Sequence, residues 1–152
     1  MRIATLADPR PREARIALTP SAVAKLAKFA SVSVPRGLGA ALGFADEDYA
    51  QAGADLVAPE AALEGADLVA LVNAPAPELL EQLQPGTALV GLLDPFRNAR
   101  LVQNLARRGV NALAMDLIPR TSYAQKMDAL SSQASLAGYA AVIKAADRIG
   151  KA

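Results

Sequence analysis

The segment VNALAMDLIPRTSYAQKMDALSS, residues 110–132, is the part of the sequence that best indicates the fold. Its first six residues, 110–115, form an apolar run typical of a buried strand, and a helix rich in small residues is predicted to start at Asp128. A strand, a polar loop and a helix in this order are typical of α/β proteins with a parallel sheet. The loop is then expected at the carboxyl edge of that sheet, where doubly wound folds bind ligands.

Short apolar runs alternate with amphipathic stretches along the rest of the chain. Strands are predicted at residues 2–6, 31–34, 67–72, 87–92 and 110–115, with a further short strand around 55–57. Helices are predicted at residues 20–29, 77–83, 98–107 and 128–149. Right-handed crossovers would place helices on both faces of the sheet. We therefore predict a three-layer, flavodoxin-like (Rossmann-like) α/β domain that extends over residues 1–152 without an internal boundary.

Composition excludes several classes of function. A chain of 152 residues with 53% hydrophobic side chains can bury one substantial core. Sixteen basic and fifteen acidic side chains leave no net field that would attract nucleic acid, so no nucleic-acid partner is expected. Without cysteine or histidine the chain lacks thiolate nucleophiles, the usual general base and the commonest transition-metal ligand, so no metal is expected. No apolar run approaches the roughly 20 residues that span a bilayer, and a cytoplasmic location is expected.

The loop in residues 116–128 carries the side chains best suited to binding. Arg120 offers a planar fork for oxygen acceptors, Gln125 offers a donor and an acceptor, and Asp128 offers an anion. A purely structural interpretation is also open, in which Pro119 breaks the chain, Asp128 caps the following helix and Arg120 pairs with it.

A glycine-rich segment, residues 37–43, follows a predicted strand and superficially resembles a pyrophosphate-binding loop. The third glycine comes one residue too late for that motif, and the carboxylates of residues 46–48 follow where a phosphate would lie. We interpret the segment as a glycine-assisted loop beside the site.

A second charged cluster, formed by Arg10, Arg12, Glu13 and Arg15, follows the first strand. Its structural interpretation is that Glu13 and Arg15 pair with each other or with neighbours.

Six ordered segments resemble the NAD(H)-binding subunit of proton-translocating nicotinamide nucleotide transhydrogenase and the related alanine dehydrogenases. The matching positions on the loop are Arg120, Gln125, Asp128, Ser131 and Ser132. The other matching segments are residues 12–20, 37–44, 49–54, 72–75 and 112–116. The match covers nearly the whole chain and identifies it as similar to the amino-terminal domain of that subunit.

This resemblance implies hydride transfer from NADH to NADP⁺, coupled to proton passage through a membrane component. Arg120, Asp128 and Ser131, together with Ser132, would bind the nicotinamide carboxamide and ribose of NAD(H). Gln125 would reach toward the NADP(H) held by a partner domain, so that Gln125, Asp128 and Arg120 are the expected catalytic residues. Positioning would then supply most of the catalysis, since no proton is abstracted in the hydride step.

Family members carry a second, dinucleotide-binding Rossmann domain that these residues lack. The chain would therefore need that domain or the remaining α subunit, with NADP(H)-binding and membrane subunits that would hold it peripherally at the cytoplasmic membrane. We expect very weak NAD(H) binding and no turnover by the isolated chain, whether it is a fragment or a short gene product. Monomer and homodimer remain equally open.

Two alternatives belong to other functional classes. One is an alanine-dehydrogenase-like oxidoreductase domain, in which Arg15 would bind a substrate carboxylate. In that family a lysine and a histidine complete the site, whereas the matching positions here are Leu71 and Asp94. The other is a noncatalytic binding module that kept the same fold.

Overall fold

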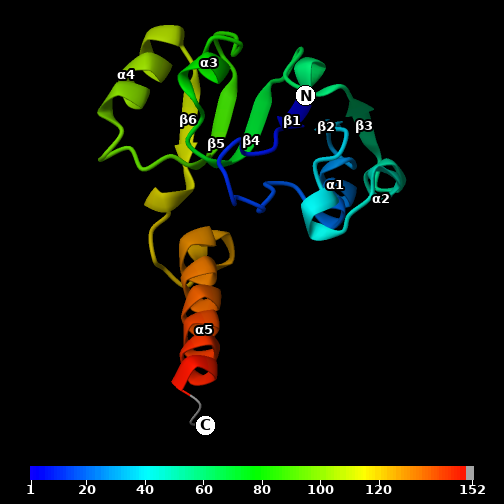
Figure 1. Cartoon of the computed structure of the whole chain (residues 1–152). Coiled ribbons are helices and arrows are strands. Elements are labelled where there is room, and N and C mark those ends of the chain that lie inside the picture. Colours follow the sequence, from blue (N-terminus) through cyan, green and yellow to red (C-terminus); the bar gives the residue numbers. More distant parts are fainter. Residues whose placement is uncertain (150–152) are drawn as a thin grey trace. The chain divides into compact units, whose positions relative to one another are not determined.

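The computed structural model describes residues 1–149. It consists of two compact units, Met1–Ala114 and Met115–Ala152. The first unit contains the whole sheet, and the second contains the loop of residues 116–128 and the long helix that follows it (Figure 1). The extent of the predicted domain, residues 1–152, stays a prediction.

The first unit is built on a six-stranded, entirely parallel sheet. Its strands are β1 (Arg2–Thr5), β2 (Ser31–Pro35), β3 (Ala54–Val57), β4 (Leu68–Asn73), β5 (Ala88–Leu92) and β6 (Asn111–Ala114). They lie in the order β3-β2-β1-β4-β5-β6. This is the order of the classic dinucleotide-binding fold, so the predicted α/β class is confirmed and the sheet has its Rossmann-like form.

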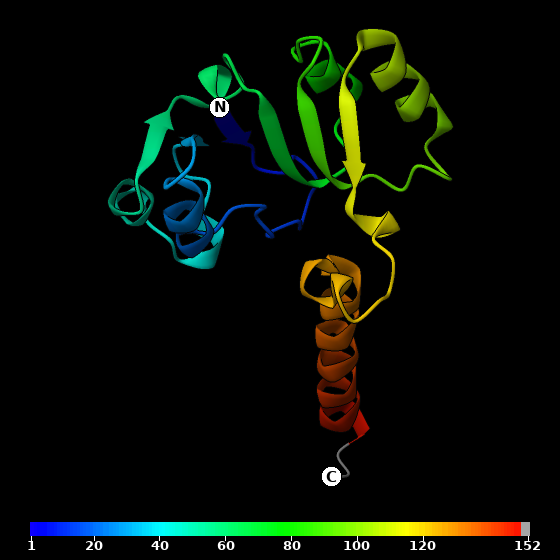
Figure 2. The same ribbon diagram turned by 180° about the vertical axis from the view of Figure 1, so that it is seen from behind.

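Helices cover the two faces of this sheet (Figures 1 and 2). They are α1 (Pro20–Leu26), α2 (Asp46–Gln51), α3 (Pro77–Leu80) and α4 (Ala99–Arg108). Adjacent strand residues point to opposite faces: Ile3 packs in one apolar cluster with Val23 of α1, and Ala4 packs in another with Leu105 of α4. The sheet therefore separates two cores, as expected for a three-layer domain.

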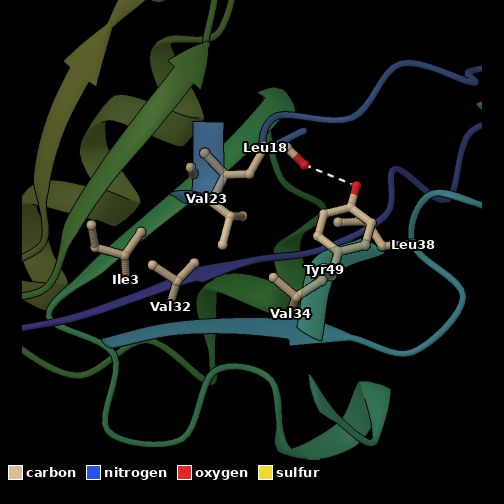
Figure 3. Close-up of a cluster of buried hydrophobic side chains, with 8 residues drawn as sticks. Ile3, Leu18, Val23, Val32, Val34, Leu38 and Tyr49 are labelled. Atoms are coloured by element: carbon tan, nitrogen blue, oxygen red, sulfur yellow. Dashed lines mark hydrogen bonds between the residues drawn. The ribbon is translucent and has the colours of Figure 1, made fainter. Parts of the chain in front are cut away.

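The core beneath α1 and α2 contains a buried polar anchor. Tyr49 is fully buried between Val34 and Leu38, and its hydroxyl donates a hydrogen bond of 3.0 Å to the carbonyl oxygen of Leu18 (Figure 3). This bond joins α2 to the segment that enters α1. It satisfies the one polar atom of a large side chain that is otherwise apolar.

Local capping explains where α1 begins. Thr19 adopts an extended conformation and accepts from the backbone N–H of Ala22, while Pro20 occupies the first turn. The helix ends at Leu26, earlier than the predicted residue 29, because residues 27–30 continue as turns.

Helix α2 was not predicted from the sequence. It is only six residues long, and Tyr49 is its one buried residue, so it shows no apolar periodicity. Its first turn contains Asp46, Glu47 and Asp48, which favour a helix amino terminus, and the Asp48 carboxylate accepts from the Ala45 N–H at 2.7 Å. The carboxylates that argued against a phosphate loop therefore serve to start a helix.

The second unit contains two 3₁₀ helices, η3 (Met115–Leu117) and η4 (Ala124–Met127), followed by α5 (Ala129–Ile149). No residue of α5 is buried, although several of its side chains are large and apolar. Among the described helices, none combines the length and the apolar composition required to cross a membrane.

Candidate functional site

The sheet has a crevice at its topological switch point. The chain moves outward in one direction from β1 to β3 and in the other from β4 to β6, so β1 and β4 are neighbours whose following connections diverge. Doubly wound folds bind ligands at the carboxyl ends of such strands. A cavity of about 240 Å³ lies there, lined mainly by residues 6–10 after β1 and residues 71–76 at the end of β4.

Polar side chains tie the two sides of this cavity together. The Asn73 amide donates to the carboxylates of Asp8 at 2.8 Å and Glu13 at 3.0 Å. Arg10 donates to the carbonyl oxygen of Ala74 at 2.6 Å, and its backbone N–H donates to Asp8 at 2.9 Å. The polar groups of this crevice are thus bonded to one another, and the loop after β1 is fixed against the end of β4.

Sequence reasoning missed Asp8 and Asn73 as members of this network. Asn73 belongs to one of the segments that carry the family resemblance, residues 72–75, and it ends a strand. The available signal was a polar residue at or shortly after the end of each of two predicted strands. The sequence did not show that these two strands, β1 and β4, lie side by side in the sheet.

Glu13 and Arg15 form a two-point ion pair, which confirms the structural interpretation of this cluster. Arg15 donates to both carboxylate oxygens of Glu13, at 2.8 Å from Nε and 2.6 Å from a terminal nitrogen. The Arg15 hydrogen bond lowers the Glu13 pKa from 4.5 to about 2, and Asn73 acts in the same direction. The same hydrogen bond raises the pKa of Arg15. The guanidinium that would bind a substrate carboxylate in an alanine dehydrogenase is therefore paired within the chain.

The positions of Leu71 and Asp94 add no charged donor to this crevice. Leu71 lines the cavity, and its backbone carbonyl lies close to Gly91 of β5. Asp94 follows β5 in a left-handed conformation with φ of 45°.

The glycine-rich segment forms a compact turn and not a phosphate cradle. Gly37 and Gly43 have φ of 77° and 80°, which favours glycine, and Gly43 ends the 3₁₀ helix η1 (Ala40–Leu42). A Cβ on Gly39 would lie 2.6 Å from Cβ of Phe44. The Gly37 N–H donates to the Asp46 carboxylate at 2.7 Å. The glycines are required by turns and packing, and the Gly37 N–H already binds a carboxylate of the chain.

The loop of the second unit is ordered by local capping bonds. The Asp128 carboxylate accepts from the backbone N–H of Ser131 at 2.9 Å, which is the geometry of a helix amino-terminal cap. The hydroxyl of Thr121 accepts from the Ala124 N–H at 3.3 Å, and the Ser132 hydroxyl donates to the Ala129 carbonyl at 3.1 Å. The Thr121 bond caps the start of η4, which contains Gln125, and the other two bonds lie at the start of α5.

Electrostatics keep Asp128 ionised. Hydrogen bonds from Ser131 lower its pKa, and the positive charge of Arg120 acts in the same direction. The side chains of Arg120, Gln125 and Ser131 are exposed. The structural interpretation of Asp128 as a cap is confirmed, and the same bond leaves an ionised carboxylate beside exposed hydrogen-bonding groups.

The sequence model of the alanine dehydrogenase/PNT N-terminal domain matches residues 6–137 of the chain. The chain belongs to this family. The match extends from the end of β1 into α5, so it includes both the switch-point crevice and the loop before α5.

Known members of the alanine dehydrogenase/PNT family resemble the chain closely. It is 43% identical over 141 residues to the NAD(P) transhydrogenase subunit alpha of Cereibacter sphaeroides, a match that covers 91% of the chain and 27% of that protein. The solved transhydrogenase structure from Sinorhizobium meliloti superposes with a TM-score of 0.90 and 34% identity, over 96% of the chain and 44% of the other. A solved L-alanine dehydrogenase superposes with a TM-score of 0.72 and 30% identity, over 78% of the chain and 33% of that protein. The chain thus spans less than half the length of these relatives.

Proposed function

We infer that the chain forms part of the NAD(H)-binding subunit of a proton-translocating NAD(P) transhydrogenase. In this role the loop of residues 116–132 faces the nicotinamide during hydride transfer between NADH and NADP⁺. The observation that carries the proposal is the Asp128–Ser131 cap, since it holds an ionised carboxylate at the start of α5 on a loop with exposed Arg120 and Gln125. The 43% identity to a transhydrogenase α subunit supports it.

The donor set on this loop fits the polar groups of a nicotinamide riboside. The guanidinium of Arg120 would donate to a carboxamide oxygen, whereas the Asp128 carboxylate would accept from carboxamide N–H or ribose hydroxyl groups. Ser131 and Ser132 add hydroxyls at the same helix end. Gln125 has a donor and an acceptor that suit a second cofactor held by another subunit.

In this mechanism the residues of the chain orient and do not transfer protons. A bound dinucleotide would supply the hydride, and the side chains of the loop would orient its nicotinamide ring. An aspartate with a lowered pKa stays an acceptor at neutral pH, so its bonds to a bound cofactor would be charge-assisted. The absence of histidine is compatible with this role, because direct hydride transfer needs no general base.

We infer further that the isolated chain is inactive. The segment of residues 37–43 forms a turn, so it offers no pyrophosphate cradle, and the adenine and pyrophosphate sites would belong to the Rossmann domain of a longer subunit. The NADP(H)-binding and membrane subunits would complete the enzyme. The two-point pair of Glu13 with Arg15, and the apolar Leu71, argue against oxidation of alanine at the switch-point crevice.

A chimera tests the proposal. Residues 1–152 replace the matched part of the Sinorhizobium meliloti transhydrogenase chain, and the other subunits of that enzyme are added. Hydride transfer from NADH to a spectrally distinct NADP analogue is then measured. Asp128→Asn is expected to slow the reaction by about 10- to 100-fold, because hydrogen bonds to a charged group are worth about 1.5–3 kcal/mol. Gln125→Asn is expected to slow it by about 2- to 10-fold, because the hydrogen bonds of a neutral amide are worth about 0.5–1.5 kcal/mol.

The choice of variants separates function from folding. Asparagine caps helices as well as aspartate does, so Asp128→Asn should keep α5 intact while it removes the charge. Lys126→Gln, an exposed change in the same 3₁₀ helix, is the matched control and should leave the rate unchanged. Unchanged rates for both Asp128→Asn and Gln125→Asn in a folded chimera would refute the assignment.

A further inference from the structure

Arg12 adopts a backbone conformation that is unfavourable for arginine. It lies in the loop between β1 and α1 with φ of 71°, in the left-handed region that residues with a Cβ rarely occupy. Glycine and asparagine adopt this conformation at a lower cost in free energy. The turn itself therefore gives no reason for an arginine at this position.

Hydrogen bonds on both sides of Arg12 hold it in this conformation. The Glu13 N–H donates to the carbonyl oxygen of Arg10 at 3.1 Å, so the backbone closes a turn around Arg12. Arg10 donates to the Ala74 carbonyl oxygen, and the Glu13 carboxylate accepts from Asn73, so both ends of the turn are attached to the end of β4. Strained backbone persists where its surroundings fix it in this way, and such positions cluster at functional sites.

The Arg12 side chain gains nothing from this strain within the chain. Among residues 1–149, its guanidinium makes no hydrogen bond or ion pair. The carboxylates of Asp8 and Glu13, in the same loop, already accept hydrogen bonds from other groups. The guanidinium of Arg97, in the turn after β5, also has no such partner in the described part of the chain, and the nearby Asp94 is not free. A partner for these two charges must therefore come from another molecule.

Arg12 and Arg97, here called the edge arginines, belong to the same edge of the sheet. Each follows the carboxyl end of a parallel strand, β1 or β5, and only β4 lies between these two strands. Neighbouring strands are about 4.8 Å apart, so β1 and β5 are separated by about 10 Å. This is close to the screening length of roughly 8 Å at physiological salt, so the two charges can attract one anionic surface together.

The carboxyl edge is also the edge from which the chain continues into the loop that contains Gln125, because β6 ends there. We propose that the edge arginines bind carboxylates on the surface of the NADP(H)-binding subunit and orient that subunit on this chain. The guanidinium is suited to this contact, because its planar fork binds a carboxylate through two parallel hydrogen bonds. This inference rests on the proposed function, since it requires that partner.

Calorimetric titration of the Sinorhizobium meliloti NADP(H)-binding subunit into the chimera described above tests the proposal. Arg12→Asn combined with Arg97→Gln should weaken binding about tenfold at about 50 mM salt, and less than about twofold at about 0.5 M salt, where screening is stronger. Lys25→Gln combined with Lys28→Gln is the matched control. These exposed lysines lie at the end of α1 and before β2, at the opposite edge of the sheet, and the same loss of charge there should leave binding unchanged.

The stability of Arg12→Asn separates a lost contact from a damaged loop. Asparagine tolerates the left-handed conformation, so the urea midpoint of the variant should rise while its binding weakens. Weaker binding with a lower urea midpoint would overturn the proposal, because the loop itself would then be perturbed.

Other outcomes of the titration also decide against the edge arginines. Unchanged binding by the double variant overturns the proposal, and so does the absence of any complex with the unmodified chimera. A loss of binding seen only when the subunit holds NADP(H) overturns it as well, because a phosphate of the cofactor would then be the anion. The Asp128→Asn test is measured as a rate at saturating partner, so a failure of the hydride-transfer assignment is distinguished from a failure of this one.

Discussion

At the scale of single residues, the Glu13–Arg15 pair provides the sharpest test of the electrostatics. The folded-state pKa of Glu13 is lowered to about 2 from 4.5, so its contribution to stability is present above about pH 4.5 and is lost as the pH falls toward 2. Glu13→Gln should lower the free energy of unfolding by about 1–2 kcal/mol at pH 7, after allowance for the partial exposure of Arg15. Urea denaturation at pH 7 and pH 3 should show a smaller loss at pH 3.

Glu64→Gln is the control for this prediction, because Glu64 is exposed. It should change stability little at either pH. An equal loss for Glu13→Gln at pH 3 and pH 7 would mean that the carboxylate charge is not what stabilises the loop after β1.

The buried Tyr49 hydroxyl gives a second prediction at this scale. Tyr49→Phe removes the bond to the Leu18 carbonyl and leaves that acceptor buried, which should cost about 1–2 kcal/mol. Thermal or chemical denaturation measures the loss. Tyr123→Phe, at a side chain that is 90% exposed, should have no effect, and similar values for the two variants would contradict the role of the hydrogen bond.

Individual contacts were predictable only where both partners lie close together in the sequence. The pairing of Glu13 with Arg15 and the capping by Asp128 involve neighbours two or three residues apart. The bonds from Asn73 to Asp8 and Glu13 span 65 and 60 residues and depend on which strands adjoin. No local pattern contains that information.

At the scale of elements, two glycines should respond to alanine in opposite directions. A Cβ on Gly91 of β5 would lie 2.8 Å from the backbone oxygen of Leu71 in β4, which cannot move without disturbing the strand pairing. Gly91→Ala should therefore destabilise the chain by about 1–3 kcal/mol. Gly138 in α5 has open space around it, so Gly138→Ala should increase the helicity of α5, with a gain of about 0.5–1 kcal/mol. Circular dichroism with urea denaturation measures both.

The stability of the Gly91→Ala variant tests how closely β4 and β5 approach each other. If Gly91→Ala were as stable as the unmodified chain, the close approach of Leu71 would be wrong. The register of the β4–β5 pairing shifts between Ala70 and Asn73, and the close approach of Leu71 to Gly91 lies at this shift.

Helices and strands were predictable where their apolar residues recur at the spacing of that element. All six strands lie within one or two residues of the predicted ranges, since each is a short apolar run between turn residues. Helix α4 was predicted because it is ten residues long and amphipathic. Helix α2 was missed, since six residues with one buried side chain carry no period.

At the scale of the whole molecule, the proposed function predicts that residues 1–152 alone bind NADH poorly. The loop would contact only the nicotinamide end of the dinucleotide, so a dissociation constant above about 1 mM is expected, equivalent to less than about 4 kcal/mol of binding energy. Fluorescence titration of NADH against the purified chain measures it. The chimera with the Sinorhizobium meliloti polypeptide should bind at least tenfold more tightly, and micromolar binding by the isolated chain would contradict a divided site.

The sequence by itself determined the α/β class, the six strands, the absence of thiol and imidazole chemistry, and the family resemblance carried by the loop before α5. These follow from composition and from patterns within a few residues, because backbone geometry and burial impose periods of about two or 3.6 residues. Only the tertiary structure decided that β1 adjoins β4, that a cavity opens at their carboxyl ends, and that Asn73 links Asp8 to Glu13. Strand order depends on contacts between residues that are distant in the chain, and local patterns do not specify those contacts.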